Sequence, residues 1–300
     1  MRLAMVGLGR MGANMTRRLL DGGHEVVVFD IDEAAVAASV EGGALGSASL
    51  AELGAQLEAP RVVWVMVPSG PITDSTIEEL ADVLEPGDLI IDGGNSRYTH
   101  SAQRAAALAE RELAFIDCGT SGGIWGLEEG YNLMAGGTPE AIALAMPVFE
   151  TLAPAGGFAH VGPAGAGHFV KMVHNGIEYG LMQAYGEGFE LLQRSEFGLD
   201  VGQIAELWRH GSVVRSWLLD LVARALTSDP DLSELSDVVA DSGEGRWTIE
   251  AAIQAGVPVP AIASALFHRF GSQQDASFAG KVISALRHEF GGHPVGKPKP

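Results

Sequence analysis

The 300-residue sequence is short of cysteine, of positive charge and of long apolar runs, and each shortage excludes a class of protein. The single cysteine, Cys118, excludes an intramolecular disulfide framework and fits a reducing compartment, where we expect it to be a small core residue. Lysine and arginine number 19 against 38 acidic residues, and the net charge of −19 disfavours nucleic acid as a partner. No apolar run approaches the roughly 18 residues of a membrane span, and the strand pattern that starts at Arg2 leaves no room for a signal peptide. We therefore expect a cytoplasmic protein without a membrane partner.

Length and composition predict two globular domains. A chain of 300 residues with 47% hydrophobic and 19% charged residues is typical of globular proteins and long enough for two cores. Strand signals alternate with helical signals up to residue 162 and then stop, so the predicted domains are 1–162 and 163–293. The end of the chain, 294–300, is predicted to be a tail because it is rich in Gly, Pro and Lys.

The beginning of the chain has the pattern of a dinucleotide-binding turn. A short apolar run is followed by Gly7-x-Gly9-x-x-Gly12 and then by a helical pattern. In this pattern Gly7 makes the tight turn, Gly9 lets a pyrophosphate approach the backbone, and Gly12 permits close packing of helix on strand. A second strand, "EVVVFD", ends in Asp30, at about the 20-residue distance that the fingerprint requires. The combination predicts a Rossmann-type domain with the phosphates at the helix N-terminus.

Asp30 is the residue that predicts the choice of cofactor. A carboxylate at this position would accept hydrogen bonds from the adenosine ribose hydroxyls and repel a 2′-phosphate, and the following "IDE" offers no arginine to hold one. The sequence thus favours NAD over NADP, although an ordinary turn residue at a strand end would also fit. The predicted cofactor contacts are Gly7, Leu8, Gly9, Arg10, Met11, Gly12, Asp30, Val67, Pro68 and Asn95.

Further apolar strands predict the rest of a doubly wound parallel sheet. They are "RVVWVMVPSG", "DLIIDGGN" and "LAFIDCGTSGG", and helix-length segments separate them. Ligands of such sheets bind beyond the carboxyl ends of the strands, where this chain has the loops 67–70, 93–96 and 119–123. The backbone N–H groups of the "SGG" in the third loop suit a carboxylate, so the site is predicted at this edge of the sheet.

After residue 162 the sequence predicts helices alone. They are 165–195, 201–210, 213–226, 233–239, 246–255, 258–271 and 275–289, with Gly, Pro and Asp between them. The predicted fold is therefore an α/β Rossmann-type doubly wound domain followed by an all-α C-terminal domain.

The first of these predicted helices carries a run of polar residues in the stretch "KMVHNGIEY". At 100° per residue, the polar side chains fall within about 140° of arc. They are Lys171, His174, Asn175, Glu178 and Tyr179. A solvated surface face with a weak Lys–Glu pair would give the same pattern. The scarcity of lysine favours chemistry instead, because the chain has only four lysines and a lysine can lose its proton where an arginine cannot.

Seven motifs along the chain together resemble those of the 6-phosphogluconate dehydrogenases. In chain order they are "GLGRMGANM", "DGGNS", "GTSGG", "KMVHNGIEYG", "SGEGRWT", "GVPVP" and "FGGH". The resemblance extends from Leu3 to His293, and the chain is similar to the short, bacterial, often NAD-using branch. "KMVHNGIEY" is specific to this family, whereas the glycine motifs belong to the wider β-hydroxyacid dehydrogenase superfamily.

The resemblance implies a role for each residue of the predicted site. The implied catalytic residues are Lys171 as general base, Glu178 as general acid, and His174 and Asn175 beside them. The implied ligands of the substrate carboxylate and hydroxyls are Asn95, Ser121, Gly122, Gly123, His174 and Asn175. The implied phosphate ligands are Tyr179 and Arg269. Arg287 and His293 match a pair that enters the active site of a partner subunit, which implies an obligate homodimer or homotetramer.

One motif departs from the family pattern. The stretch that reads KGTGKWT in the long-chain members reads "SGEGRWT" here, with Ser242 and Glu244 in place of Lys and Thr. Glu244 would repel a phosphate unless it faces away or pairs with Arg246. Phosphate recognition would then depend on Arg269 and Arg287, or the preferred substrate differs.

The reaction that the resemblance implies is the oxidative decarboxylation of 6-phosphogluconate to ribulose 5-phosphate and CO₂, with hydride transfer to NAD and no metal. Its implied setting is the pentose phosphate pathway and gluconate utilization. The remaining histidines show no metal-ligand spacing, and we expect them at the surface or in the core.

Two alternatives to this reaction stay open. One is a related 3-hydroxyacid dehydrogenase or imine reductase that acts on a different substrate, with or without a phosphate. The other is an NAD-binding regulatory protein without catalysis. An intact pair of Lys171 and Glu178 favours decarboxylation, because simple hydroxyacid oxidation leaves no carbanion to protonate.

Overall fold

The computed structural model describes residues 1–296, so the end of the predicted tail, 297–300, lies outside the described residues. The described chain divides into two compact units, Met1–His174 and the residues from Asn175 onward. The division falls inside one long helix, α8 (Ala166–Gln193), whose first turns belong to the first unit. The predicted domain boundary at 162/163 lies shortly before the start of this helix.

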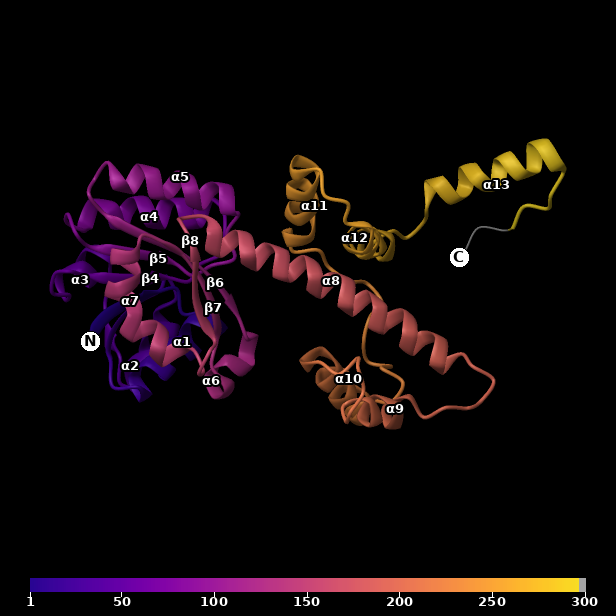
Figure 1. The fold of residues 1–300 in the computed structure, drawn as a ribbon, viewed down its shortest axis with the longest axis horizontal. Helices are drawn as coiled ribbons and strands as arrows, with labels where there is room; N and C mark the ends of the chain where they lie inside the picture. Colours follow the sequence, from indigo (N-terminus) through magenta and orange to yellow (C-terminus); the bar gives the residue numbers. More distant parts are fainter. Residues whose placement is uncertain (297–300) are drawn as a thin grey trace. The chain divides into compact units, whose positions relative to one another are not determined.

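The first unit is built on one sheet with the strand order β3-β2-β1-β4-β5-β6-β7-β8 (Figure 1). Its strands are β1 (Arg2–Val6), β2 (Glu25–Phe29), β3 (Leu45–Gly46), β4 (Val62–Val65), β5 (Leu89–Asp92), β6 (Ala114–Ser121), β7 (Asn132–Gly137) and β8 (Phe158–Gly162). The pairs from β3 through to β6 are parallel, which confirms the predicted doubly wound sheet. Strand β7 runs antiparallel to β6, a reversal that the sequence reasoning did not predict.

The reversal at β7 follows from the short connection that precedes it. Between β6 and β7 the chain forms only a single 3₁₀ turn, η1 (Gly123–Trp125), and a short helix, α6 (Gly126–Glu129). A parallel pair needs a crossover of a dozen residues or more, and this connection is shorter than that. The loop with the "SGG" motif is therefore a tight reversal at the carboxyl end of β6.

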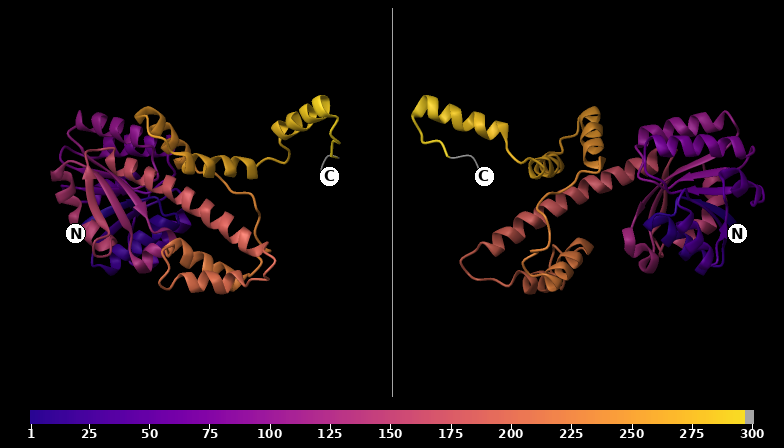
Figure 2. Two further views of the ribbon diagram at one scale, coloured as in Figure 1. Left: turned by 45° about the vertical axis from the view of Figure 1, so that its right-hand side comes forward. Right: turned by 180° about the vertical axis from the view of Figure 1, so that it is seen from behind.

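Helices cover both faces of the sheet (Figures 1 and 2). One face is covered by α1 (Arg10–Asp21), α2 (Glu33–Glu41) and α7 (Pro139–Leu152), and the other by α3 (Leu50–Ala55), α4 (Pro71–Val83) and α5 (Tyr98–Ala109). Strand β1 shows the alternation that supports both cores, because Leu3 and Met5 belong to the first core and Ala4 and Val6 to the second. Burial on both faces explains why the strands read as continuous apolar runs.

As predicted, the described residues 175–296 contain helices and connecting segments but no strand. Besides the rest of α8 it contains α9 (Val201–Trp208), α10 (Trp217–Ser228), α11 (Glu244–Ala255), α12 (Pro260–Ser272) and α13 (Phe278–Gly291). Two small cores hold α8 to α12 together, and neither includes a residue of α13. Leu219 and Leu226 of α10 pack with Tyr185 and Phe189 of α8, and Tyr179 packs with residues of α12.

Two of the predicted helices differ from the structure. The predicted helix at 233–239 is wrong, because side chains there bond the backbone locally: Asp229 accepts the Glu234 N–H at 3.2 Å and Ser236 accepts the Val238 N–H at 3.2 Å. The helix predicted from residue 213 begins at Trp217 instead. Ser216 caps it by accepting the Leu219 N–H at 3.1 Å.

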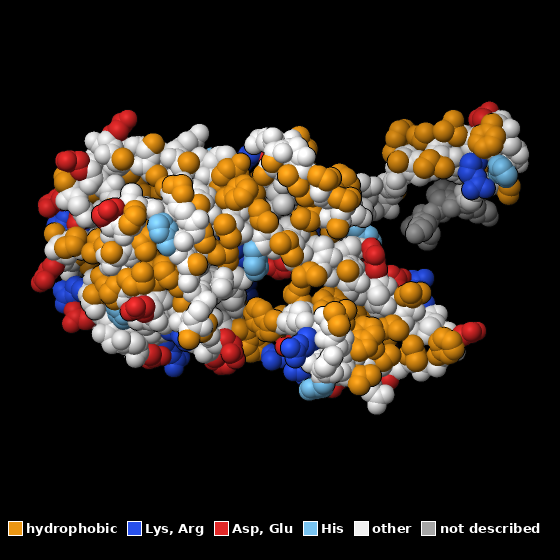
Figure 3. All heavy atoms as spheres, in the orientation of Figure 1, with side chains coloured by type: hydrophobic (Ala, Val, Ile, Leu, Met, Phe, Trp, Pro, Cys, Tyr) orange, Lys and Arg blue, Asp and Glu red, His pale blue; other side chains and the backbone are white. Residues whose placement is uncertain are grey.

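Helix α13 leaves an apolar face uncovered within the described chain. Phe278 and Phe290 are each 78% exposed and Ile283 is 60% exposed. Figure 3 shows hydrophobic side chains gathered along this helix. Such a patch is unusual on a monomer and typical of an interaction surface. Among residues 1–296, no helix combines the length and the apolar character needed to cross a bilayer.

Candidate active site

The glycine turn after β1 packs closely at two positions and is open at a third. Gly7 has a φ of +95°, and a β-carbon there would lie 2.5 Å from the Met66 backbone oxygen. A β-carbon on Gly12 would lie 1.9 Å from the Gly7 backbone oxygen, so α1 reaches β1 only with glycine at this position. At Gly9 a β-carbon would meet nothing within 4 Å.

The start of α1 suits a pyrophosphate. Gly9 precedes the helix and supplies no side-chain cap, and the first turn carries no acidic residue. The free N–H groups and the positive end of the helix dipole are therefore available to an anion. Leu8 is buried beneath the turn, while Arg10 is exposed beside it. These residues fit the phosphates of a dinucleotide such as NAD.

The Asp30 carboxylate is fixed at the end of β2 beside this turn. Its Oδ2 accepts the Leu8 N–H at 2.5 Å, and its Oδ1 accepts the Asp32 N–H at 2.9 Å. A carboxylate has about four lone-pair sites, so acceptor capacity remains for ribose hydroxyls. Asp30 therefore also has the local structural role that the sequence left open, since it ties the glycine turn to the next strand.

The loop with Asn95 follows β5 and is supported by a buried carboxylate. Asp92, the last residue of β5, accepts the Gly94 N–H at 3.2 Å and a hydrogen bond from Arg104 of α5 at 2.7 Å. Arg104 also binds Asp74 of α4 at 2.7 Å. Asn95 itself is exposed at the tip of the loop. The loop before it in the sheet, with Val67 and Pro68, is held similarly, because the Thr73 hydroxyl donates to the Pro68 carbonyl at 2.9 Å.

The "SGG" loop starts at the last residue of β6, Ser121. Gly122 has a φ of +128° and Gly123 a φ of +52°, conformations in which successive backbone N–H groups can converge on an anion. Gly122 also lies against the following segment, since a β-carbon there would be 3.4 Å from the Tyr131 ring. Ser121 is half-buried and Gly123 is exposed, so the loop is open to a ligand.

Lys171 and His174 lie together on the part of α8 that belongs to the first unit. Lys171 is only 8% exposed, and its Nζ lies 3.5 Å from His174 Nδ1. A β-carbon on Gly119 of β6 would come 2.3 Å from the Lys171 β-carbon, so the lysine rests directly on this strand. The interpretation as a solvated surface residue does not hold for Lys171, because its side chain is buried.

In the second unit, Tyr179 and Arg269 lie together beside the start of α11. The Arg269 guanidinium stacks on the Tyr179 ring at 3.4 Å from its centroid. The Tyr179 hydroxyl lies 3.2 Å from Ser242 Oγ and donates to Asp241 Oδ1 at 3.5 Å. Asp241 also bonds the Arg246 side chain. Arg246 forms an ion pair with Asp241, and Glu244, at the start of α11, is buried.

The other predicted residues of the second unit lie at separate places. Asn175 and Glu178 follow Lys171 along α8 and are both half-buried. Arg287 lies on α13 and His293 just beyond it, and both are exposed. Their recorded contacts are within this terminal segment, where the His293 N–H donates to the Arg287 carbonyl at 3.4 Å.

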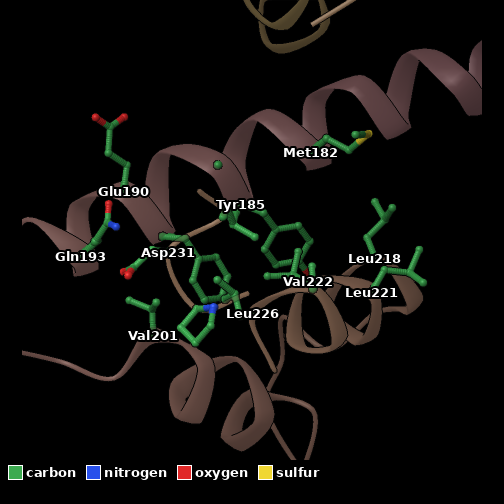
Figure 4. Close-up of a pocket in the computed structure, with 15 residues that line it drawn as sticks. Met182, Tyr185, Glu190, Gln193, Val201, Leu218, Leu221, Val222, Leu226 and Asp231 are labelled. Carbon is green, nitrogen blue, oxygen red and sulfur yellow. The ribbon is translucent and has the colours of Figure 1, made fainter. Parts of the chain in front are cut away.

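A cavity of about 520 Å³ lies within the second unit. Figure 4 shows it between Met182 and Tyr185 of α8 and Leu218 and Val222 of α10. None of the predicted site residues belongs to its lining, which is mainly apolar. Within residues 1–296, no group of three or more His, Cys, Asp or Glu side chains is arranged to hold a metal ion.

Sequence reasoning missed three carboxylates that build the site loops: Asp92, Asp117 and Asp241. Asp92 accepts the Gly94 N–H beside Asn95, Asp117 accepts the Gly165 and His168 N–H groups at the start of α8, and Asp241 accepts the Gly243 N–H beside Ser242. The signal was visible for two of them, since "IID" and "FID" place an aspartate near the end of an apolar strand just before a glycine-rich loop. Cys118, which follows Asp117, is buried as expected, and burial raises the pKa of its thiol.

A Rossmann unit with an open glycine turn, followed by a helical unit, defines a nicotinamide-dinucleotide-dependent dehydrogenase. The chain belongs to the 6-phosphogluconate dehydrogenase family. Residues 2–162 match the NAD binding domain of 6-phosphogluconate dehydrogenase, and residues 167–290 match the C-terminal domain of the same enzyme.

Individual relatives agree with this assignment. The NAD⁺-dependent, decarboxylating 6-phosphogluconate dehydrogenase of Haloferax volcanii is 45% identical over 299 residues, covering 99% of each chain. The decarboxylating enzyme of Lactococcus lactis subsp. cremoris is 35% identical over 96% of this chain but 65% of its own length. Among solved structures, the Plasmodium falciparum 6-phosphogluconate dehydrogenase has a TM-score of 0.83 at 27% identity, covering 100% of this chain and 67% of that one.

Proposed function

We propose that this protein oxidises and decarboxylates 6-phosphogluconate to ribulose 5-phosphate and CO₂, with NAD as the electron acceptor. The observation that carries the proposal is the burial of Lys171 on α8. This lysine packs against Gly119 of β6, two residues before Ser121 in the sequence. It stands in a chain 45% identical to an NAD⁺-dependent, decarboxylating relative of equal length. Asp30 supports NAD over NADP, because its fixed carboxylate would repel a 2′-phosphate.

The first step requires a base at the C3 hydroxyl. Lys171, in its neutral form, accepts the hydroxyl proton. When bound, NAD supplies the acceptor for the hydride that leaves C3. His174, 3.5 Å from the amine, provides a polar partner that orients Lys171. The loop at 121–123 would hold the substrate carboxylate with its backbone N–H groups.

The second step requires an acid at the same place. Protonated Lys171 donates a hydrogen bond to the new C3 ketone, which polarises it and allows the C1 carboxylate to depart as CO₂. Glu178, two helical turns further along α8, then protonates the carbon that CO₂ has left, and ribulose 5-phosphate forms. A lysine can serve as base and then as acid, whereas an arginine cannot lose its proton.

One observation favours a second candidate, a sugar acid without a phosphate. The Asp241 carboxylate accepts a hydrogen bond from the Tyr179 hydroxyl and forms an ion pair with Arg246. Both contacts lie in the region where the resemblance places the phosphate. A negative charge there opposes a phosphate unless the substrate displaces it. Under this alternative the catalytic residues keep their roles and gluconate replaces its phosphate ester.

We also propose a homodimer or homotetramer in which Arg287 and His293 reach the partner's active site. The uncovered apolar face of α13 supports the assembly, and Arg287 and His293 lie at the end of the same helix. The single, buried cysteine supports a cytoplasmic location with a role in gluconate utilization through the pentose phosphate pathway.

The test is a comparison of initial rates with two substrates and two cofactors. NADH or NADPH formation is followed with 6-phosphogluconate and with gluconate, each with NAD and with NADP. We expect the highest kcat/KM for 6-phosphogluconate with NAD. A higher value for gluconate would assign the non-phosphorylated alternative, and no turnover with any pair would contradict both.

A further inference from the structure

The helix that carries Lys171 lacks a capping side chain of its own. Helix α8 begins at Ala166, and the residue before it, Gly165, has a φ of +96° and no side chain that could bind the free N–H groups of the first turn. The acceptor comes from β6 instead. Asp117 Oδ1 accepts the Gly165 N–H at 2.6 Å, and its Oδ2 accepts the His168 N–H at 2.7 Å. One strand carboxylate thus takes the place of the usual cap.

A second contact fixes the same turn from the other side. The imidazole Nδ1 of His168 lies 2.7 Å from Ser101 Oγ on α5 and 3.9 Å from Asp117 Oδ2. Asp117 and Ser101 are fully buried and His168 is 1% exposed. Burial raises the pKa of Asp117, while His168 and the two N–H donors act in the opposite direction. In this dry environment, loss of the carboxylate would leave buried N–H groups without an acceptor.

No side chain separates α8 from the strand at this point. A β-carbon on Gly167 would lie 2.3 Å from the Asp117 backbone oxygen, and one on Gly119 would lie 2.3 Å from the Lys171 β-carbon. Asp117, Gly119 and Ser121 alternate along β6 and so share one face of the sheet. Three features therefore follow one another along β6. Asp117 binds the start of α8, Gly119 contacts Lys171, and Ser121 begins the "SGG" loop.

We propose that Asp117 is a positioning residue for Lys171. By holding the first turn of α8 on β6, it sets where the amine lies relative to loop 121–123, without touching the substrate itself. The inference rests on the proposed function only in treating Lys171 as the base. The hydrogen bond between His168 and Ser101 is a second anchor that holds the start of α8 in place.

The chain offers a matched control for the loss of a buried aspartate. Asp88, also fully buried, precedes β5 and accepts the Arg61 N–H at 2.7 Å and the Glu85 N–H at 2.9 Å. Like Asp117, Asp88 accepts two backbone N–H groups, but it lies at the amino end of the strands, where no residue of the predicted site lies. The Asp88→Asn variant therefore shows the general effect of losing a buried carboxylate that accepts backbone N–H groups.

The experiment measures how accessible Lys171 is in the folded protein. Asp117→Asn and Asp88→Asn are acetylated briefly near pH 10, close to the pKa of a lysine in a model peptide, and peptide mass spectrometry gives the ratio of modified Lys171 to modified Lys281. Lys281 is exposed on α13 and serves as the internal reference. We expect the ratio to rise at least fivefold in Asp117→Asn and to change less than twofold in Asp88→Asn. An unchanged ratio in folded Asp117→Asn would overturn the proposal.

A milder variant decides the question if Asp117→Asn does not fold. Ser101→Ala removes only the second anchor, and we expect the Lys171 to Lys281 ratio to rise at least twofold with NAD affinity unchanged. No rise would overturn the proposal. The acetylation needs no substrate, so its outcome stays separate from the proposed function. In turnover assays normalised to NAD-binding sites, we expect Asp117→Asn to lower kcat at least tenfold with the KM for NAD changed less than twofold.

Discussion

At the scale of single residues, the proposed chemistry depends on Lys171, a lysine that the fold buries. Lys171 is 8% exposed, whereas Lys281 is exposed on the surface of α13. An arginine at position 171 would keep the positive charge and much of the bulk but could not accept a proton near neutral pH. The proposed mechanism therefore distinguishes the two residues by proton transfer rather than by charge.

For Lys171→Arg we expect kcat to fall by roughly 10³-fold, within the usual range for removing a general base, with NAD affinity and melting temperature close to wild type. Steady-state kinetics with 6-phosphogluconate and fluorescence titration with NAD measure these quantities. Lys281→Arg is the matched control and should retain wild-type turnover. Near-normal turnover in Lys171→Arg would show that another group is the base.

Asp30 allows a second prediction at this scale. Its carboxylate binds the glycine turn through the Leu8 N–H, so Asp30→Ala would disturb the turn as well as the ribose site. Asp30→Asn keeps an acceptor and removes the charge that opposes a 2′-phosphate. We expect the ratio of kcat/KM for NAD to that for NADP to fall about tenfold or more, the effect of one or two charge-assisted hydrogen bonds. An unchanged ratio would show that Asp30 does not determine the preference for NAD over NADP.

The sequence predicted these two residues but not the carboxylates that hold their surroundings. Lys171 was predictable because lysine is scarce in this chain. Asp30 was predictable because it lies at the expected spacing from the glycine motif. Asp117 and Asp241 act on backbone N–H groups about 50 residues away and two residues away, respectively. For Asp117, the strand pattern marks the aspartate itself, but its pairing with a distant helix start depends on tertiary structure, which neither propensity nor periodicity encodes.

At the scale of elements, the start of α11 depends on Asp241. Its carboxylate accepts the Gly243 N–H at 3.0 Å and bonds Arg246 in the first turn of the helix. Although burial acts in the opposite direction, the hydrogen bonds from Arg246 and Gly243 hold the pKa of Asp241 below its usual range. The folded state therefore binds this proton less readily than the unfolded state, and ionised Asp241 stabilises the fold.

For Asp241→Asn we expect the free energy of unfolding at pH 7 to fall by about 1–3 kcal/mol, the cost of lost hydrogen bonds to a charged group. The stabilisation is fully present above the ordinary carboxyl pKa, near 4, and is lost as the pH falls through the lower pKa of the folded state. The difference between variant and wild type in urea unfolding should therefore shrink below about pH 4. A difference that stays constant from pH 7 to pH 3 would contradict the role of the charge.

Elements with strong periodicity were predicted well, and elements that depend on local side-chain competition were not. Strands β1, β2, β4, β5 and β6 follow from apolar runs, and α8 follows from a long helical pattern. The predicted helix at 233–239 failed because serine and aspartate side chains bind the backbone there. The antiparallel β7 was missed because the direction of a strand depends on the length of the connection before it.

At the scale of the whole molecule, α13 is a helix whose apolar face is left uncovered by the described residues. Its exposed apolar residues favour assembly, and Arg287 and His293 at its end would then reach the partner's site. For Ile283→Asp we expect light scattering to show a smaller species than wild type, together with reduced turnover. Ile72→Asp, on the exposed surface of α4, is the control and should leave the mass unchanged. An unchanged mass for Ile283→Asp would argue against this interface.

The central claim is that one active site both oxidises its substrate and removes the carboxylate, and the release of C1 tests it most directly. With 6-phosphogluconate labelled with ¹⁴C at C1, radioactive CO₂ and NADH are measured together over the course of one reaction. We expect one CO₂ for each NADH, because Lys171 as an acid and Glu178 as a proton donor complete the decarboxylation. NADH formation without CO₂ would identify a simple hydroxyacid dehydrogenase and contradict the proposed mechanism.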